Sequence, residues 1–234
     1  MEILVDYNNI NPSTRQRGLV YVVERICERL GSELLSDHKH LTFRLYGGWY
    51  DERTLSPRAQ RLIAERERDF PRKVTVPSEK DPPTLIVQAE MAHSLACLPT
   101  KKIWRTYRKR GAPRGIRCEN PRDLGCECED CPLIPTHLLV TNQCCPQEHC
   151  EITFRDVLSR RQQKQVDTML AVDLLYYART EQEVGVVSSD DDFWPPILQA
   201  LSGGSRIVHV QTQPDRVKPF HDDLTSEYVS RTIV

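Results

Sequence analysis

Aspartates stand at three places in the chain where the neighbouring residues are mainly apolar. Asp6 directly follows one apolar run, Asp190 and Asp192 follow another, and Asp167 lies inside a third. Carboxylates in such surroundings repel one another and lose hydration, and a divalent cation offsets both costs. Because oxygen donors without His or Cys suit hard cations, the pattern favours Mg²⁺ or Mn²⁺ over zinc. The predicted chemistry is phosphodiester hydrolysis, in which the ion activates a water and neutralises phosphate charge.

Helix capping is the simpler explanation for part of this pattern. Asp190 or Asp192 is well placed to cap a helix that starts near Phe193. Asp167 and Asp173 are separated by roughly 240° around a helix of 3.6 residues per turn, so they cannot both point at one cation. We expect one of these two to face the site and the other to cap, pair or contact the site indirectly.

Alternating strand and helix patterns surround these aspartates. Apolar runs and alternating residues predict strands at 2–5, 41–46, 73–76, 85–95, 185–187 and 207–210. Helical spacing predicts helices at 19–30, 58–70, 162–178 and 193–201. Strands that alternate with helices predict an α/β fold with a mostly parallel sheet covered on both faces. Ligands of such sheets bind beyond the carboxyl ends of the strands, where Asp6 and Asp190 stand.

Three segments of the chain carry a distinctive combination of residues. Val5–Ile10 contains Asp, two spacers, Asn and an aliphatic residue, Lys164–Asp167 reads Lys-Gln-Val-Asp, and Ser188–Phe193 reads Ser-Ser-Asp-Asp-Asp-Phe. In type and order these segments resemble the motifs of the NYN branch of the PIN-like nucleases, including its LabA-like members. Gln165 and Ser189 stand where that family has glycine, whereas no carboxylate of the motifs is lost.

This resemblance implies a PIN-like three-layer fold and a metal-dependent endonuclease that usually acts on RNA. It implies that Mg²⁺ or Mn²⁺ is held by the carboxylates of Asp6, Asp167, Asp190 and Asp192, with Asn9 orienting the site and Asp173 as a secondary candidate. The nuclease domain is expected at 1–96 and 151–234, because the resemblance does not cover 97–150. A DNA nuclease, or a non-catalytic RNA-binding or adaptor module on the same fold, is the alternative.

Seven of the nine cysteines lie between Cys118 and Cys150. Prolines in the surrounding stretch, 97–150, predict an irregular insertion with one strand at 137–140. A structural zinc ion takes four ligands, often two pairs separated by a loop. The best pairs are Cys128 with Cys131 and Cys145 with Cys150, and the alternates are Cys118, Cys126, Cys144 and His149. Two metal sites, or reduced thiols without metal, are the competing interpretations.

A basic segment without acidic residues extends from Lys101 to Arg117 and adjoins the cysteines. Cations neutralise phosphates, and aromatic rings stack on unpaired bases. The predicted nucleic-acid-binding residues are Lys101, Lys102, Trp104, Arg105, Tyr107, Arg108, Lys109, Arg110, Arg114 and Arg117. A solvated charged face is the alternative, and the nuclease motifs favour binding. The insertion is also a candidate surface for a protein partner.

The overall composition limits the class of protein. The 32 Lys and Arg against 33 Asp and Glu leave a formal net charge of −1, so attraction to nucleic acid must come from a local patch. The mean hydropathy is −0.52, and no apolar run approaches the ~20 residues of a membrane-spanning helix. The first ten residues lack the pattern of a signal peptide. These features predict a cytoplasmic protein without a membrane partner.

Overall fold

The computed structural model describes residues 1–79, 81–110, 116–158, 160–163, 165–181, 183–213 and 227–232, and it omits the side chains of 108–110 and 160–163. The chain divides into two compact units. The first comprises 1–106 and 163–234, and the second comprises 107–162. The second unit therefore begins and ends later than the insertion expected at 97–150.

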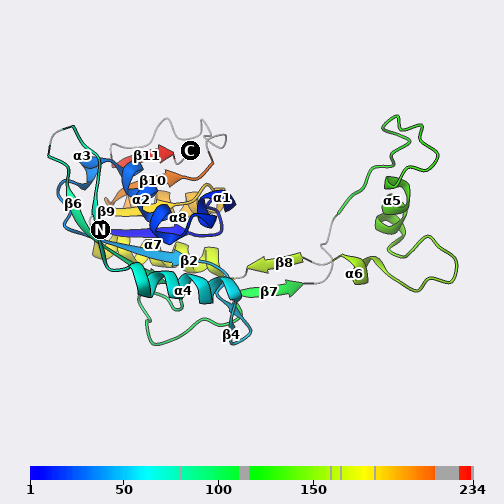
Figure 1. Ribbon diagram of the computed structural model, residues 1–234, viewed down its shortest axis with the longest axis horizontal. Coiled ribbons are helices and arrows are strands. Elements are labelled where there is room, and N and C mark those ends of the chain that lie inside the picture. The colour runs from blue at the N-terminus through cyan, green and yellow to red at the C-terminus, as the bar shows by residue number, and fades with distance from the viewer. Residues whose placement is uncertain are drawn as a thin grey trace. The chain divides into compact units, whose positions relative to one another are not determined.

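A seven-stranded sheet forms the centre of the first unit (Figure 1). Its strand order is β11 (Tyr228–Thr232), β10 (Arg206–Gln211), β9 (Glu183–Val187), β1 (Glu2–Asp6), β2 (His40–Tyr46), β6 (Thr84–Met91) and β5 (Arg72–Thr75). Neighbouring strands are parallel except for β5 and β6, which are antiparallel. The predicted α/β fold with a mostly parallel sheet is confirmed.

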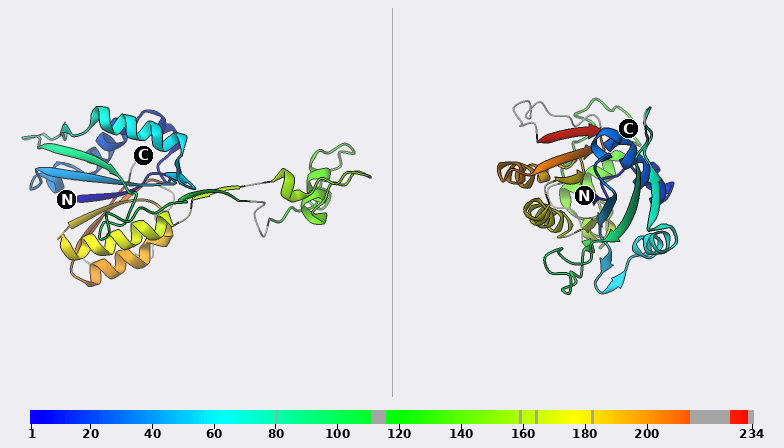
Figure 2. Two further views of the ribbon diagram at one scale, coloured as in Figure 1. Left: turned by 90° about the horizontal axis from the view of Figure 1, so that it is seen from below. Right: turned by 90° about the vertical axis from the view of Figure 1, so that its left-hand side faces the viewer.

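Helices cover both faces of this sheet, as the left view of Figure 2 shows. The helices α2 (Leu19–Leu30) and α4 (Pro57–Asp69) pack on one face, and α7 (Val166–Thr180) and α8 (Trp194–Ser202) pack on the other. Strand β1 contributes to both cores, because Ile3 belongs to one cluster and Leu4 to the other. Alternate side chains of a strand point to opposite faces, so β1 is buried on both sides and its end is held rigidly.

Short elements connect these strands and helices. They are α1 (Pro12–Gln16), α3 (Ser32–Leu35), β3 (Tyr50–Asp51), β4 (Thr54–Leu55) and the 3₁₀ turn η1 (Asp191–Phe193). The helix α1 lies between the strand expected at 2–5 and the helix expected at 19–30, where no further element was predicted. Its start follows from two local signals, since Asn11 Oδ1 accepts the Ser13 N–H at 3.0 Å and Pro12 occupies the first helical position.

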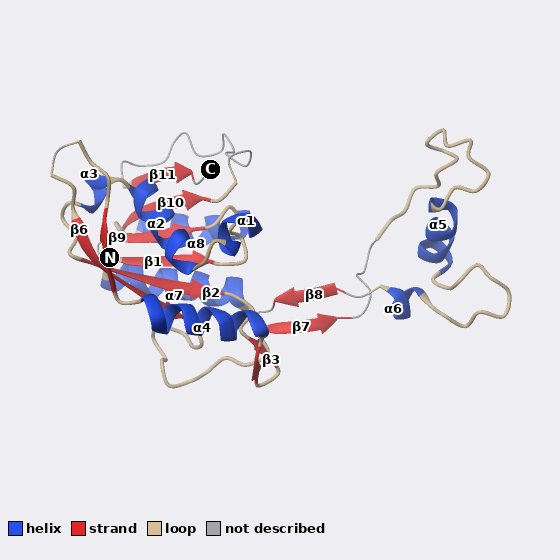
Figure 3. Ribbon diagram, viewed as in Figure 1, coloured by secondary structure: helices blue, strands red, loops and turns tan. Residues whose placement is uncertain are grey.

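The second unit is mostly loop in its described part (Figure 3). It contains α5 (Leu133–Asn142), α6 (Phe154–Val157) and the neighbouring strands β7 (Tyr107–Arg110) and β8 (Arg160–Gln163). The strand expected at 137–140 is wrong, because these residues lie in α5. Pro135 falls in the first turn of that helix, where a missing N–H costs nothing.

Several predicted boundaries in the first unit also need correction. The helix expected at 162–178 begins only at Val166, since β8 occupies the residues up to Gln163. The strand expected at 85–95 ends at Met91, and β11 was not expected. Within the described ranges, no helix is long and apolar enough to cross a bilayer.

Candidate active site

The order of the strands places two of the predicted aspartates at one edge of the sheet. The chain proceeds from β1 to β2 on one side and later returns as β9 on the other side of β1. Asp6 is the last residue of β1, and Asp190 follows β9, whose Val187 pairs with Val5. Ligands of open α/β sheets bind at such a reversal of strand order, beyond the carboxyl ends of the strands. The topology therefore makes this edge the candidate site.

Asp6 is a buried carboxylate with few hydrogen bonds. Its side chain lies in a residue that is 3% exposed. The Asn8 N–H donates to Oδ1 at 3.2 Å, and the Ser188 hydroxyl donates to Oδ2 at 3.4 Å. Burial, together with the negative charges of Asp167 and Asp190, raises the pKa of Asp6 to about 7, although hydrogen bonds from the Asn8 and Asn9 backbone lower it. The negative charges of Asp167 and Asp190 therefore both act on the buried Asp6 carboxylate.

Asp167 reaches this site from the first turn of α7. The residue before the helix, Gln165, has φ of 67° and caps it in the left-handed conformation. The Met169 N–H donates to the Gln165 carbonyl at 2.8 Å and starts the helix there. Position 165 is thus one where glycine is the least strained residue, and the resembling nuclease motif has glycine at that position.

Asn9 and Ser189 hold the ends of three strands together. Asn9 Oδ1 accepts the Ser189 N–H at 2.9 Å and also accepts the Thr212 hydroxyl. Ser189 Oγ accepts the N–H groups of Thr212 at 2.7 Å and Gln213 at 2.9 Å. The serine side chain therefore ties the end of β9 to the end of β10, a contact that a glycine at this position could not make.

Asp190 and Asp192 differ in position. Asp190 caps η1, since its Oδ1 accepts the Asp192 N–H at 3.2 Å, and its own N–H donates to Ser188 Oγ at 3.1 Å. Asp190 therefore caps η1 and also lies close enough to Asp6 for its charge to act on that residue. Asp192 is exposed, and its charge is not among the main influences on Asp6.

Asp173 lies in a different environment on α7. It is fully buried and accepts hydrogen bonds from Arg44 Nε at 3.0 Å, the Tyr46 hydroxyl at 2.7 Å and the Ala96 N–H at 2.7 Å. Its described hydrogen bonds go to this network and none goes to the residues around Asp6. The carboxylate is thereby neutralised by a buried guanidinium, and it serves to fasten α7 to β2.

The donor set around Asp6 suits a hard divalent cation. The three carboxylates come from separate elements, and their mutual repulsion is of the kind that a bound cation removes. Among the described residues, no three His, Cys, Asp or Glu side chains are close enough to form a complete metal-ligand group. The chemistry of these oxygen donors therefore fits Mg²⁺ or Mn²⁺. The described carboxylates are nevertheless too far apart to surround one cation as they stand.

The cysteines of the second unit are all reduced and are not grouped as metal ligands in its described part. Cys131 is buried, and its sulfur is hydrogen-bonded to the backbone of Leu133 and to Cys126, which lower its pKa. Cys128, the expected partner of Cys131, is exposed. Downstream, Cys144 and Thr153 form an antiparallel β-bridge, and the Cys145 N–H donates to the Ile152 carbonyl at 2.9 Å. These contacts close a loop that carries Cys145, His149 and Cys150.

The predicted basic segment is divided between the two units. Lys101, Lys102, Trp104 and Arg105 belong to the first unit, Tyr107 and Arg117 belong to the second, and the side chains of Arg108, Lys109, Arg110 and Arg114 lie outside the described ones.

Two of these residues are engaged within the first unit. Arg105 Nε pairs with Glu52 at 2.5 Å, and the Trp104 ring meets Tyr50 edge-on at 4.6 Å between centroids. Trp104 remains 37% exposed, with the Lys102 ammonium 5.7 Å from its centroid.

A group of basic residues close to the acidic site was not predicted from the sequence. The charge of Asp6 acts on Arg15, in α1, and Arg58, in α4, donates to the side chain of Asn8, whose own N–H donates to Asp6. Sequence signals for the starts of these helices were available, because each has a polar N-cap residue followed by proline at its first position, Asn11-Pro12 in α1 and Ser56-Pro57 in α4. Proximity between the two helices depends on packing and has no sequence signal.

Comparison of the chain with family models, curated proteins and solved structures gives no significant match.

Proposed function

We propose that this protein is a metal-dependent nuclease of the PIN-like NYN type that hydrolyses RNA phosphodiester bonds. The observation that carries the proposal is the convergence of three carboxylates from β1, α7 and the end of β9 at one sheet edge, where the charges of Asp167 and Asp190 act on the buried Asp6. The left-handed Gln165 supports the resemblance, because the family motif has glycine at that position.

Each residue has a distinct role in this proposal. Asp6, Asp167 and Asp190 hold the cation, and Asp192 is the exposed candidate for a fourth oxygen donor. Asn9 and Ser189 position the strand ends, and Ser188 links Asp6 to Asp190 through its hydroxyl. A bound Mg²⁺ or Mn²⁺ supplies activation of water and neutralises charge on the phosphate. Asp6 must lose its proton to act as a ligand, which its raised pKa places near neutral pH.

Cleavage of labelled single-stranded RNA and DNA, with Mg²⁺, Mn²⁺ or EDTA, tests the proposal. We expect divalent-dependent RNA cleavage that falls at least about a hundredfold in Asp6→Asn and Asp190→Asn, since direct ligands matter more than the residues around them. Asp37→Asn is the matched control, because Asp37 is exposed and precedes β2 at the opposite end of the strands. Full activity in both site variants would exclude this site.

A non-catalytic RNA-binding or adaptor module on the same fold is the competing function. The absence of a closed metal-ligand group in the described residues favours it. RNA binding by the wild-type protein without cleavage in any divalent cation would establish this alternative. Preferential cleavage of DNA in the same assay would instead identify a DNA nuclease.

We further propose that the second unit binds structural zinc through Cys126 or Cys128, Cys131, Cys145 and Cys150. Its described part buries only three hydrophobic side chains, Cys131, Val140 and Phe154, so it lacks a core of ordinary size. Metal binding supplies folding free energy to units of this kind. Elemental analysis of the purified protein should find about one zinc per chain, and less than about half an equivalent with no other metal would contradict the proposal.

A further inference from the structure

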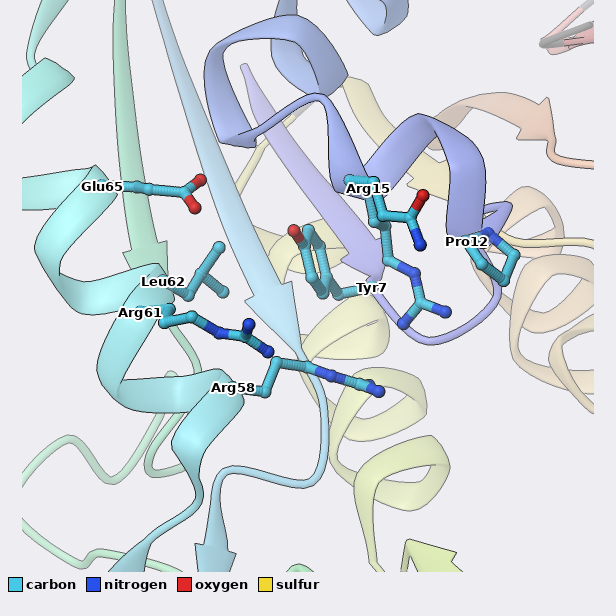
Figure 4. A pocket seen from close by; sticks show the side chains of 8 residues that line it. Tyr7, Pro12, Arg15, Arg58, Arg61, Leu62 and Glu65 are labelled. Atoms are coloured by element: carbon cyan, nitrogen blue, oxygen red, sulfur yellow. The ribbon is translucent and has the colours of Figure 1, made fainter.

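A pocket of about 360 Å³ lies between α1 and α4. One of its walls is Tyr7, the residue that follows Asp6 in the sequence. It is lined by Tyr7, Pro12, Arg15, Gln16, Arg58, Arg61, Leu62 and Glu65. Figure 4 shows Arg58 and Arg61 extending from α4 toward Tyr7 and toward Arg15 of α1. Three guanidinium groups from two helices therefore surround one hollow.

Among the described residues, no carboxylate forms an ion pair with the three arginines of this pocket, although the charge of the nearby Asp6 favours the charged form of Arg15. Burial lowers the pKa of Arg15, and repulsion from Arg58 lowers it further. Within the described part of the chain, Arg15 Nε is buried without a hydrogen-bond partner, and none of the three arginines forms an ion pair. In the described part of the chain, the hydrogen bond that Arg58 donates goes to the neutral Asn8 side chain.

The single acidic residue of the pocket is already engaged. Glu65 accepts the Leu19 N–H at 2.7 Å, so its carboxylate is directed to the N-terminus of α2. The Tyr7 ring forms a flat wall, with the Arg15 guanidinium 5.9 Å from its centroid. A planar wall and several free N–H donors suit a phosphate group, which guanidinium binds through paired hydrogen bonds.

The pocket is contiguous with the acidic site along the chain. Tyr7 follows Asp6, and Asn8 links the two, since its N–H donates to Asp6 and its side chain accepts from Arg58. We propose that this arginine pocket binds a phosphate group of the nucleic-acid strand, adjacent to the phosphate that the acidic site attacks. The inference rests on the proposed function. It assigns to Arg15, Arg58 and Arg61 the positioning of the substrate strand.

Binding without divalent cations tests this inference separately from cleavage. Anisotropy of labelled RNA should be measured in EDTA over a range of salt concentrations, for the wild type, Arg15→Gln, and the double variant Arg58→Gln/Arg61→Gln. Arg68→Gln is the matched control, because Arg68 is also on α4 but is 71% exposed and pairs with Asp69. Arg58 and Arg61 are exposed, so their replacement leaves the fold intact even if Arg15→Gln proves unstable.

We expect about tenfold weaker binding in the pocket variants and no change in the control, and the salt slope should fall by about one for each phosphate that is no longer neutralised.

RNAs with a 5′-phosphate or a 5′-hydroxyl identify the source of the phosphate. If the pocket variants lose affinity only for the 5′-phosphate RNA, the pocket binds a terminal phosphate. If they lose the same affinity for both RNAs, it binds an internal phosphate. Affinities and slopes equal to those of Arg68→Gln would overturn the inference. Weakened binding without any cleavage would retain the phosphate pocket and overturn only the proposed nuclease.

Discussion

Asp6 shows most clearly how a residue's surroundings determine its chemistry at this sheet edge. An aspartate at the end of a strand is commonplace, but this one is buried and stands beside the charges of Asp167 and Asp190. Asp173, six positions along the same helix as Asp167, meets a guanidinium instead. The sequence indicated that these two aspartates point in different directions, and only the packing of α7 shows which partner each one has.

The raised pKa of Asp6 predicts a specific pH dependence of stability. Because this pKa rises from 3.8 to about 7 on folding, the folded protein holds a proton that the unfolded chain releases. The resulting stabilisation is complete below about pH 4 and is lost as pH rises through about 7. We expect Asp6→Asn to raise the free energy of unfolding at pH 8 in EDTA by roughly 4 kcal/mol, since each pKa unit corresponds to about 1.4 kcal/mol.

Urea unfolding at pH 5 and pH 8 measures this difference, which should shrink at the lower pH. The asparagine keeps an acceptor for the Asn8 N–H, so loss of that hydrogen bond does not obscure the result. Asp37→Asn should behave like the wild type at both pH values. The same difference between wild type and Asp6→Asn at pH 5 and pH 8 would show that Asp6 ionises normally.

At the scale of elements, long apolar runs were the most predictable part of the fold. Strands β1, β2 and β9 and helix α2 were expected close to their observed bounds, because a buried strand or an amphipathic helix has a strong pattern. The strand β11 was missed because Tyr228–Thr232 has polar residues and lies at the edge of the sheet. The helix α5 was missed because Pro132, which precedes it, and Pro135, in its first turn, were interpreted only as breakers.

The start of α7 offers a test at this scale. Gln165 holds a left-handed conformation that costs a non-glycine residue about 1–2 kcal/mol. We therefore expect Gln165→Gly to raise the free energy of unfolding by about 1 kcal/mol, measured by urea denaturation. Gln60→Gly, in the interior of α4, should lower it by about 1 kcal/mol. Destabilisation by both substitutions would contradict the strained start of α7.

For the whole molecule, the sequence predicted the location of the acidic site better than its surroundings. Strand ends in a parallel sheet converge, so Asp6 and Asp190 were expected together and the topology brings them to one edge. The pocket formed by Arg15, Arg58 and Arg61 was not foreseen, because it arises where α1 packs near α4. Anionic and cationic surfaces thus adjoin in a protein whose formal net charge is only −1.

Calorimetric titration of the apo protein with Mn²⁺ at pH 8 tests the central claim most directly. The account predicts saturable binding to the wild type and to Asp37→Asn, and its loss in Asp6→Asn and Asp190→Asn. It also predicts weaker binding, with proton release, as the pH falls through about 7, because the cation must displace the proton of Asp6. Equal Mn²⁺ binding by the wild type and by both site variants would contradict a metal centre at this edge of the sheet.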